Sequence, residues 1–113
     1  MIEQLYPNEA LAWLAEHAGQ RPVLLDVREA WELQQASVAP AASFEFLHIP
    51  MGSLVARLHE LDPQRPVACL CHHGARSLRV AMFLAQQGFG QVANVAGGID
   101  AWSQVCDPAV PRY

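Results

Sequence analysis

The sequence contains no lysine, and its seven basic residues are arginines that form no cluster along the chain. Eleven acidic residues bring the formal net charge to -4. Proteins that bind a nucleic-acid backbone need a concentrated basic surface, because they neutralise a row of phosphates. The composition therefore argues against a nucleic acid as a partner.

Long apolar runs are also missing. No stretch approaches the ~20 residues that a membrane-spanning helix requires, and residues 1–7 have neither the charged region nor the apolar segment of a signal peptide. The three cysteines are too few, and odd in number, for a disulfide scaffold. We therefore expect no membrane partner and a cytoplasmic location with free thiols.

Hydrophobic residues are plentiful at 52%, and charged residues make up only 16%. This balance excludes a disordered chain, which would have too little apolar surface to bury. A chain of 113 residues buries roughly two-thirds of its unfolded surface on folding. These values predict one domain over residues 1–113.

Short apolar runs alternate with helical patterns along the chain. The runs predict strands near residues 2–6, 22–27, 43–47, 67–70 and 92–95. Between them, helices are expected from an N-cap at Asn8, over 30–33, after an N-cap at Ser53, over 76–87 and from 98 to 102. This alternation predicts an α/β fold with a mostly parallel sheet covered on both faces.

The helix predicted over 76–87 carries apolar side chains over much of its girth. Leu78, Ala81, Met82 and Ala85 form one stripe, and Val80, Phe83 and Leu84 widen it, so we expect much of the helix to be buried.

The segment Val67–Ser77 carries the strongest chemical signal. Its apolar run ends at Cys71, a short loop with Gly74 follows, and Arg76 opens the next helix. This order places a thiol beside backbone N–H groups and a helix N-terminus, both of which favour negative charge. Because the thiolate is the reactive form of cysteine, Cys71 is predicted to be a catalytic nucleophile.

Charged residues also follow the predicted strand at 22–27. Asp26 and Arg28 stand near its carboxyl end, where open α/β sheets bind ligands. A structural ion pair is the favoured interpretation for Asp26. For Arg28, structural and site-supporting roles are equally open.

Three segments resemble, in order, signatures of the rhodanese-like (sulfurtransferase) family. They are Leu24–Glu29 with Trp31 and Glu32, then Cys71–Ser77, then Gly97–Trp102. The resemblance implies a five-stranded, mostly parallel sheet with helices on both faces and no cofactor. It further implies that Cys71 takes a sulfane sulfur from a donor such as thiosulfate, forms a persulfide, and passes the sulfur to cyanide, a small thiol or a protein thiol.

The resemblance also implies roles for the residues of the loop after Cys71. Its backbone N–H groups would hold the persulfide and the anionic oxygens of the donor, and Arg76 would add positive charge. The predicted anion-binding residues are His72, His73, Gly74, Ala75 and Arg76.

One segment departs from the family pattern. Members commonly carry Gly-His-Ile-Pro-Gly-Ala after the first signature, whereas residues 36–42 read Ala-Ser-Val-Ala-Pro-Ala-Ala and a separate His48-Ile49-Pro50 comes later. The departure leaves the geometry of that loop open but does not touch the cysteine site.

Other chemistries fit the sequence less well. Related phosphatases and arsenate reductases place five residues between Cys and Arg, whereas four lie between Cys71 and Arg76. Cys69, Cys71, His72 and His73 lack the second, separated ligand pair that a zinc site usually has, so no metal is expected. Cys69 is expected to be a small buried residue, with a resolving thiol as the weaker alternative.

Three questions stay open at the level of sequence. His72 and His73 either tune the loop and contact an acceptor or merely face solvent. The domain could be a non-catalytic binding or regulatory module, although that class often lacks the cysteine present here. A sulfur relay to a protein partner would use the same site.

Overall fold

The computed structural model describes residues 2–113, and a five-stranded sheet forms its centre. The strands are β1 (Glu3–Leu5), β2 (Val23–Asp26), β3 (Glu45–His48), β4 (Val67–Leu70) and β5 (Val92–Val95), in the order β1-β5-β4-β2-β3. Every pairing of neighbours is parallel. The predicted five-stranded sheet is therefore confirmed, and it is parallel throughout.

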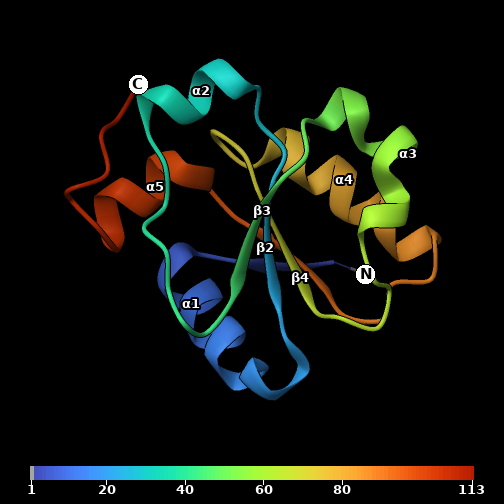
Figure 1. Ribbon diagram of the computed structural model, residues 1–113. Coiled ribbons are helices and arrows are strands. Elements are labelled where there is room, and N and C mark those ends of the chain that lie inside the picture. The colour runs from blue at the N-terminus through green and yellow to red at the C-terminus, as the bar shows by residue number, and fades with distance from the viewer. Residues whose placement is uncertain (1) are drawn as a thin grey trace.

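Helices cover both faces of this sheet. They are α1 (Pro7–Glu16), α2 (Ala30–Gln35), α3 (Leu54–Arg57), α4 (Ala75–Gln86) and α5 (Gly98–Val105), with 3-10 turns at Ala18–Gln20, Met51–Ser53 and Leu58–Glu60. Figure 1 shows α1 and α5 on one side of the sheet and α3 and α4 on the other. The α/β architecture expected from the sequence is confirmed.

The core consists of two apolar clusters, one on each face of the sheet. Leu24 of β2 points into the cluster that includes α1 and α5, and its neighbour Leu25 points into the cluster with α3 and α4. Successive side chains of a strand face opposite sides. A strand buried on both faces thus needs the unbroken apolar run seen in the sequence.

Two predicted helix starts differ from the structure. Helix α1 begins at Pro7 with Tyr6 as its N-cap, not at Asn8, and the Tyr6 amide donates to the Glu9 carboxylate at 2.9 Å. Proline is favoured at the first helical position because its missing N–H needs no partner there. Ser53 does precede α3, but its side chain makes no capping bond and α3 ends at Arg57.

The apolar band predicted for α4 is confirmed at Val80, Ala81 and Leu84 but wrong at Met82. Met82 is 51% exposed, and the buried residues of the helix are Ser77, Val80, Ala81 and Leu84. These positions lie three or four residues apart and therefore share one face. The helix is rotated so that Ser77 reaches the end of β4, a requirement that hydrophobicity alone does not reveal.

The atypical segment at 36–42 packs against the core. Ala36 and Val38 are buried with Phe44 in the cluster that includes α1 and α5. The open question about this loop is answered by packing, because apolar contacts hold it on the sheet face away from α3 and α4.

The start of α5 lies against the loop that follows β4. Ile99 and Asp100 donate their amides to the carbonyls of Cys71 at 2.9 Å and His72 at 3.1 Å. Gly98 makes this approach possible, since its φ is +61° and an added Cβ would overlap both of those carbonyl oxygens.

Gly98→Ala is expected to lower the free energy of unfolding by at least ~2 kcal/mol, because it combines a left-handed φ with a backbone clash. Urea unfolding measures the change. Gly19→Ala is the control, since no atom lies within 4 Å of the added Cβ, and it should change stability by less than ~0.5 kcal/mol. Equal effects of the two substitutions would contradict the proposed close contact.

Candidate active site

Cys71 lies directly after β4, with its sulfur at the N-terminus of α4. The Sγ atom accepts hydrogen bonds from the Gly74 amide at 3.0 Å, the Ser77 amide at 3.4 Å and the Ser77 hydroxyl at 3.2 Å. The residue is only 1% exposed. Three donors and the positive end of a helix dipole favour a negatively charged sulfur at this position.

Gly74 gives the loop its shape. Its φ is +106°, and an added Cβ would lie 3.1 Å from the Gly97 nitrogen. Its carbonyl accepts a hydrogen bond from the Asn94 side chain of β5 at 3.1 Å. The turn therefore requires glycine, and it aims the Gly74 amide at the sulfur.

Arg76 forms a bidentate ion pair with Glu32 of α2. Its two terminal nitrogens donate to the two carboxylate oxygens at 2.7 and 2.8 Å. Hydrogen bonding to Glu32 raises the pKa of Arg76, and the nearby Cys71 contributes in the same direction. The positive charge predicted for this loop is present, but a carboxylate compensates it.

Glu32 is buried although it is charged, with a side chain that is 4% exposed. Besides Arg76, it accepts hydrogen bonds from the Tyr113 hydroxyl and the Glu29 amide, each at 2.9 Å. The hydrogen bonds from Arg76 are the main reason that the pKa of Glu32 falls from 4.5 to about 2. The carboxylate is thus ionised and fully partnered at neutral pH.

Asp26 and Arg28 form a second ion pair, and both side chains are completely buried. The Arg28 guanidinium also donates to the Glu32 carbonyl at 3.2 Å and to the Tyr113 hydroxyl at 3.0 Å. Burial lowers the pKa of Arg28, but the hydrogen bonds to Asp26 and Tyr113 outweigh it, so the pKa is raised. These contacts support the structural interpretation of Asp26 and favour the same one for Arg28.

His72 and His73 stack on each other, with ring centroids 3.9 Å apart and planes at 25°. Burial is the main reason that the pKa of His72 is lowered, which favours a neutral ring at pH 7. Its Nε2 atom is buried and has no hydrogen-bond partner among the described residues. The side chain of His73 is 66% exposed, so the two histidines occupy different environments.

Within residues 2–113, the possible metal ligands lie beside these histidines. Ligand atoms of His72, His73 and Asp100 lie within 4.8 Å of one another. The stacked rings direct their in-plane nitrogen lone pairs side by side rather than toward one point, and Asp100 already accepts a hydrogen bond from Arg112 at 3.0 Å. This geometry does not suit a tetrahedral site.

Cys69 lies in the core and is 0% exposed. Burial, and secondarily the nearby Cys71, raise the pKa of its thiol far above the usual value. A buried, protonated thiol is a poor nucleophile, so the structure favours a packing role for Cys69 over a resolving role.

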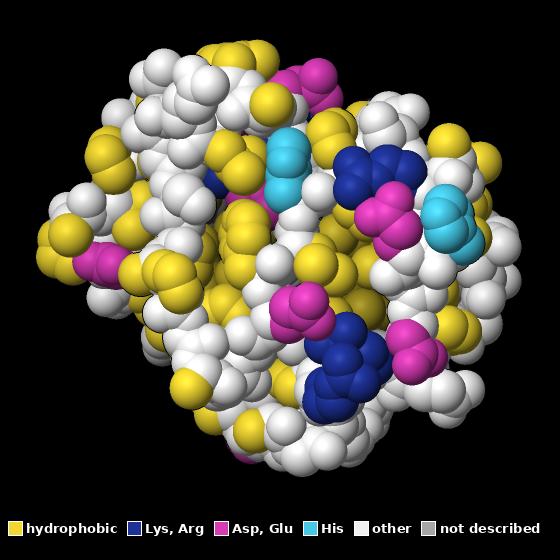
Figure 2. Space-filling view, in the orientation of Figure 1, with side chains coloured by type: hydrophobic (Ala, Val, Ile, Leu, Met, Phe, Trp, Pro, Cys, Tyr) yellow, Lys and Arg dark blue, Asp and Glu magenta, His cyan; other side chains and the backbone are white. Residues whose placement is uncertain are grey.

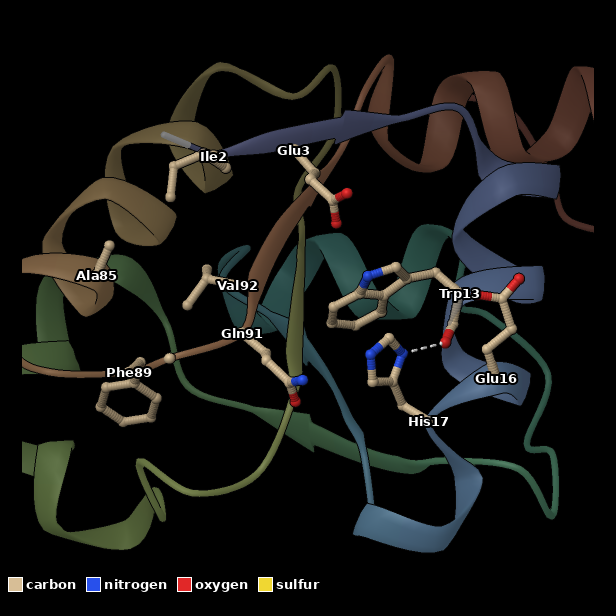
Figure 3. A pocket seen from close by; sticks show the side chains of 10 residues that line it. Ile2, Glu3, Trp13, Glu16, His17, Ala85, Phe89, Gln91 and Val92 are labelled. Atoms are coloured by element: carbon tan, nitrogen blue, oxygen red, sulfur yellow. Dashed lines mark hydrogen bonds between the residues drawn. The ribbon is translucent and has the colours of Figure 1, made fainter.

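One cavity of the structure lies away from Cys71. It measures about 500 Å³ and is lined by residues near the amino ends of β1 and β5, among them Trp13 and His17. Figure 3 shows these two side chains against each other, with Glu3 and Glu16 nearby. Cys71 follows the carboxyl end of β4, so the sulfur lies beyond the opposite ends of the parallel strands.

Three partners of the site were missed in the sequence. Ser77 donates to the sulfur, and its place directly after the loop arginine is a signal that could have been used. Glu32 lies inside the first signature, so the need of Arg76 for a counter-charge could have pointed to it. Tyr113 is 81 residues from Glu32, and nothing local connects them.

The family model for the rhodanese-like domain matches residues 10–105. The chain belongs to the rhodanese-like domain family. A sulfurtransferase from Allochromatium vinosum is 37% identical, over 73% of this chain and 72% of that protein. The thiosulfate sulfurtransferase GlpE from Actinobacillus pleuropneumoniae serotype 5b is 33% identical, over 75% of this chain and 90% of that protein.

The fold is shared with solved structures of the family. The polysulfide-sulfur transferase homodimer from Wolinella succinogenes matches with a TM-score of 0.74 and 30% identity, over 99% of this chain and 78% of that chain. Other curated relatives are much longer proteins, of which this chain spans 20 to 30%. The sulfurtransferase relatives support an activity of the same kind.

The surface gives no sign of a nucleic-acid partner on the face in Figure 2, where basic side chains stand beside acidic ones. Arg57 pairs with Glu60, and Arg65 pairs with Glu45. Among residues 2–113, no helix has the length and apolar character to cross a membrane. The cytoplasmic location and the single-domain organisation stay predictions.

The Arg76–Glu32 pair should make stability depend on pH. Because the pKa of Glu32 is about 2 in the folded protein and 4.5 ordinarily, its contribution is present above pH 4.5 and is lost as the pH falls toward 2. Glu32→Gln should therefore cost roughly 3 kcal/mol at pH 7 and much less near pH 2. Chemical unfolding across this pH range measures the difference.

Glu60→Gln is the matched control, since Glu60 forms an exposed ion pair with Arg57. Exposed pairs contribute little to stability, so this variant should track the wild type at every pH. A deficit of Glu32→Gln that stays constant from pH 7 to pH 2 would contradict the assignment of the low pKa to Glu32.

Proposed function

We propose that this protein is a sulfurtransferase in which Cys71 carries the transferred sulfur as a persulfide. The observation that carries the proposal is the position of the Cys71 sulfur, which accepts three hydrogen bonds at the N-terminus of α4. The same donors that favour a thiolate favour a terminal persulfide anion, because both place negative charge on sulfur in this loop.

The first half-reaction uses a small sulfane donor such as thiosulfate. The Cys71 thiolate attacks the outer sulfur of thiosulfate, a new S–S bond forms at Cys71, and the S–S bond of the donor breaks. Sulfite leaves with the electron pair of the broken bond. Backbone N–H groups of the loop stabilise the departing oxyanion, as an oxyanion hole does in acyl transfer.

The second half-reaction restores the thiolate. A nucleophile such as cyanide or a thiolate attacks the outer sulfur of the persulfide and takes it, and the electron pair of the broken S–S bond returns to Cys71. Electrons balance without an external oxidant or reductant, and no cofactor or metal enters either step. A two-step covalent route of this kind predicts ping-pong kinetics.

The size of the loop supports sulfur transfer over phosphatase chemistry. Four residues separate Cys71 from Arg76, and the Arg76 guanidinium is paired with Glu32 rather than free to encircle a tetrahedral anion. A compact loop with backbone donors suits one sulfur atom and one small oxyanion.

Cys71→Ser should abolish sulfur transfer and leave the fold intact, because serine keeps the size of the side chain but cannot form a persulfide. Intact-protein mass spectrometry after incubation with thiosulfate should show a gain of about one sulfur atom (~32 Da) in the wild type. Cyanide should remove this gain, and Cys71→Ser should lack it. Substantial turnover by Cys71→Ser would refute the proposal.

The same measurement separates the alternatives. Cys69→Ala is the matched control, since Cys69 is a buried neighbour with no access to solvent, and it should still form the adduct. If no donor in a panel of inorganic and organic sulfane compounds loads the wild type, the domain is a binding module.

Arg76→Ala should weaken anionic donors more than neutral ones, because it removes a positive charge and leaves the Glu32 carboxylate unpaired beside the site. We expect kcat/KM for thiosulfate to fall by about tenfold or more, and that for a neutral alkyl persulfide by about threefold or less. Arg79→Ala, an exposed arginine of the same helix, should change neither. Equal losses for both donors would count against the charge role.

A further inference from the structure

Tyr113 lies over the Cys71 site although it is far from it in the sequence. Its hydroxyl accepts a hydrogen bond from Arg28 at 3.0 Å and donates one to Glu32 at 2.9 Å. Its ring stacks on His72 with centroids 3.9 Å apart and planes only 6° from parallel. Figure 1 shows the C-terminal end of the described chain beside α2, the helix that carries Glu32.

The hydroxyl group of Tyr113 binds the carboxylate that pairs with Arg76. Oε1 of Glu32 accepts from both the Tyr113 hydroxyl and the Arg76 guanidinium. These hydrogen bonds fix the orientation of the Glu32 carboxylate. Because Arg76 binds both carboxylate oxygens, the orientation of Glu32 in turn fixes the position of the Arg76 guanidinium. The Tyr113 hydroxyl, together with the Glu29 amide on the other carboxylate oxygen, therefore holds the partner that positions the loop arginine.

The ring of Tyr113 packs against the loop that follows Cys71. The His72 ring lies between the rings of Tyr113 and His73, and His72 directly follows the cysteine. The edge-to-face contact of Trp31 with Tyr113, at 6.3 Å and 79°, holds the tyrosine ring from another side. Aromatic contacts of these kinds contribute about 0.5–1.5 kcal/mol each beyond buried area.

We propose that Tyr113 is a positioning residue of the sulfur-transfer site, which fixes Arg76 through Glu32 and fixes the loop through His72, and so determines the preference of the site for small anionic reagents. The inference rests on the proposed function for its biological meaning. Its physical content, the dependence of anion preference at Cys71 on Tyr113, does not require sulfur transfer.

Alkylation of Cys71 tests this content directly. Its thiolate displaces iodide from either iodoacetate, an anion, or iodoacetamide, which is neutral and similar in size. Rates are measured by mass spectrometry in a Cys69→Ala, Cys106→Ala background, which leaves Cys71 as the single thiol of the sequence. The ratio of the two rates reports anion preference and cancels changes in thiolate reactivity that the reagents share.

Tyr113→Leu removes both the hydroxyl and the stacking face, and it should lower the iodoacetate to iodoacetamide rate ratio about fivefold to tenfold. Tyr113→Phe keeps the ring, so it should recover part of this loss. Tyr6→Leu is the matched control, since Tyr6 is the other tyrosine and is 62% exposed, and it should leave the ratio unchanged. An unchanged ratio in Tyr113→Leu would overturn the proposal.

Nuclear magnetic resonance of the histidine rings gives a second readout, which a general loss of stability would not reproduce. The ring protons of His72 lie against the face of Tyr113, so their resonances should carry the ring-current shift of the stacked tyrosine and lose it in Tyr113→Leu. Tyr113→Phe should keep the shift, since the stack remains. Unchanged His72 resonances in a folded Tyr113→Leu variant would overturn the loop contact.

Failure of this inference and failure of the proposed function are distinguishable. If Cys71 forms no persulfide but the alkylation ratio responds to Tyr113, the positioning role holds and the sulfurtransferase assignment fails. If the persulfide forms and the ratio does not respond, Tyr113 has no positioning role in a working enzyme.

Discussion

The buried guanidinium of Arg28 constrains the end of the sheet at which Cys71 lies. A charged group that is buried away from water needs hydrogen-bond or ion-pair partners, because an unpaired buried charge lowers the stability of the fold by several kcal/mol. Arg28 finds them in the Asp26 carboxylate, the Glu32 carbonyl and the Tyr113 hydroxyl. These acceptors come from the end of β2, from α2 and from residue 113, so one side chain ties two neighbouring elements to a residue 85 positions away. The Glu32 carboxylate that receives Arg76 is placed as a result.

Formal charges around Cys71 are largely balanced. Arg76 pairs with Glu32, and Arg112 pairs with Asp100. The donors that reach the sulfur itself are two backbone amides and a hydroxyl, all of them neutral dipoles. Dipoles that are already oriented need no rearrangement when charge moves between sulfur and substrate. Oriented dipoles can therefore favour negative charge at the Cys71 sulfur in a protein whose formal net charge is -4.

Much of the fold could be predicted from the sequence because its signals are local. The run at Val23–Asp26 reveals a strand buried on both faces, and Cys71 follows another such run. The exposed face of α4 could not be predicted, because an all-round apolar helix fits several rotations and the contact of Ser77 with Cys71 selects one. The role of Arg28 stayed open in the sequence because one of its partners, Tyr113, lies 85 residues away.

The sheet joins two segments that are far apart in the chain, since Glu3 of β1 pairs with Ala93 of β5. Contacts between residues so far apart close large loops and tend to form late in folding. Until β1 docks, β5 is an unpaired edge whose four residues are apolar or buried, the kind of surface that recruits other chains. β1 is short and largely exposed, with Glu3 and Gln4 on it. This small polar strand therefore covers the buried edge of β5 and presents a polar edge in its place, while β3 forms the other edge of the sheet.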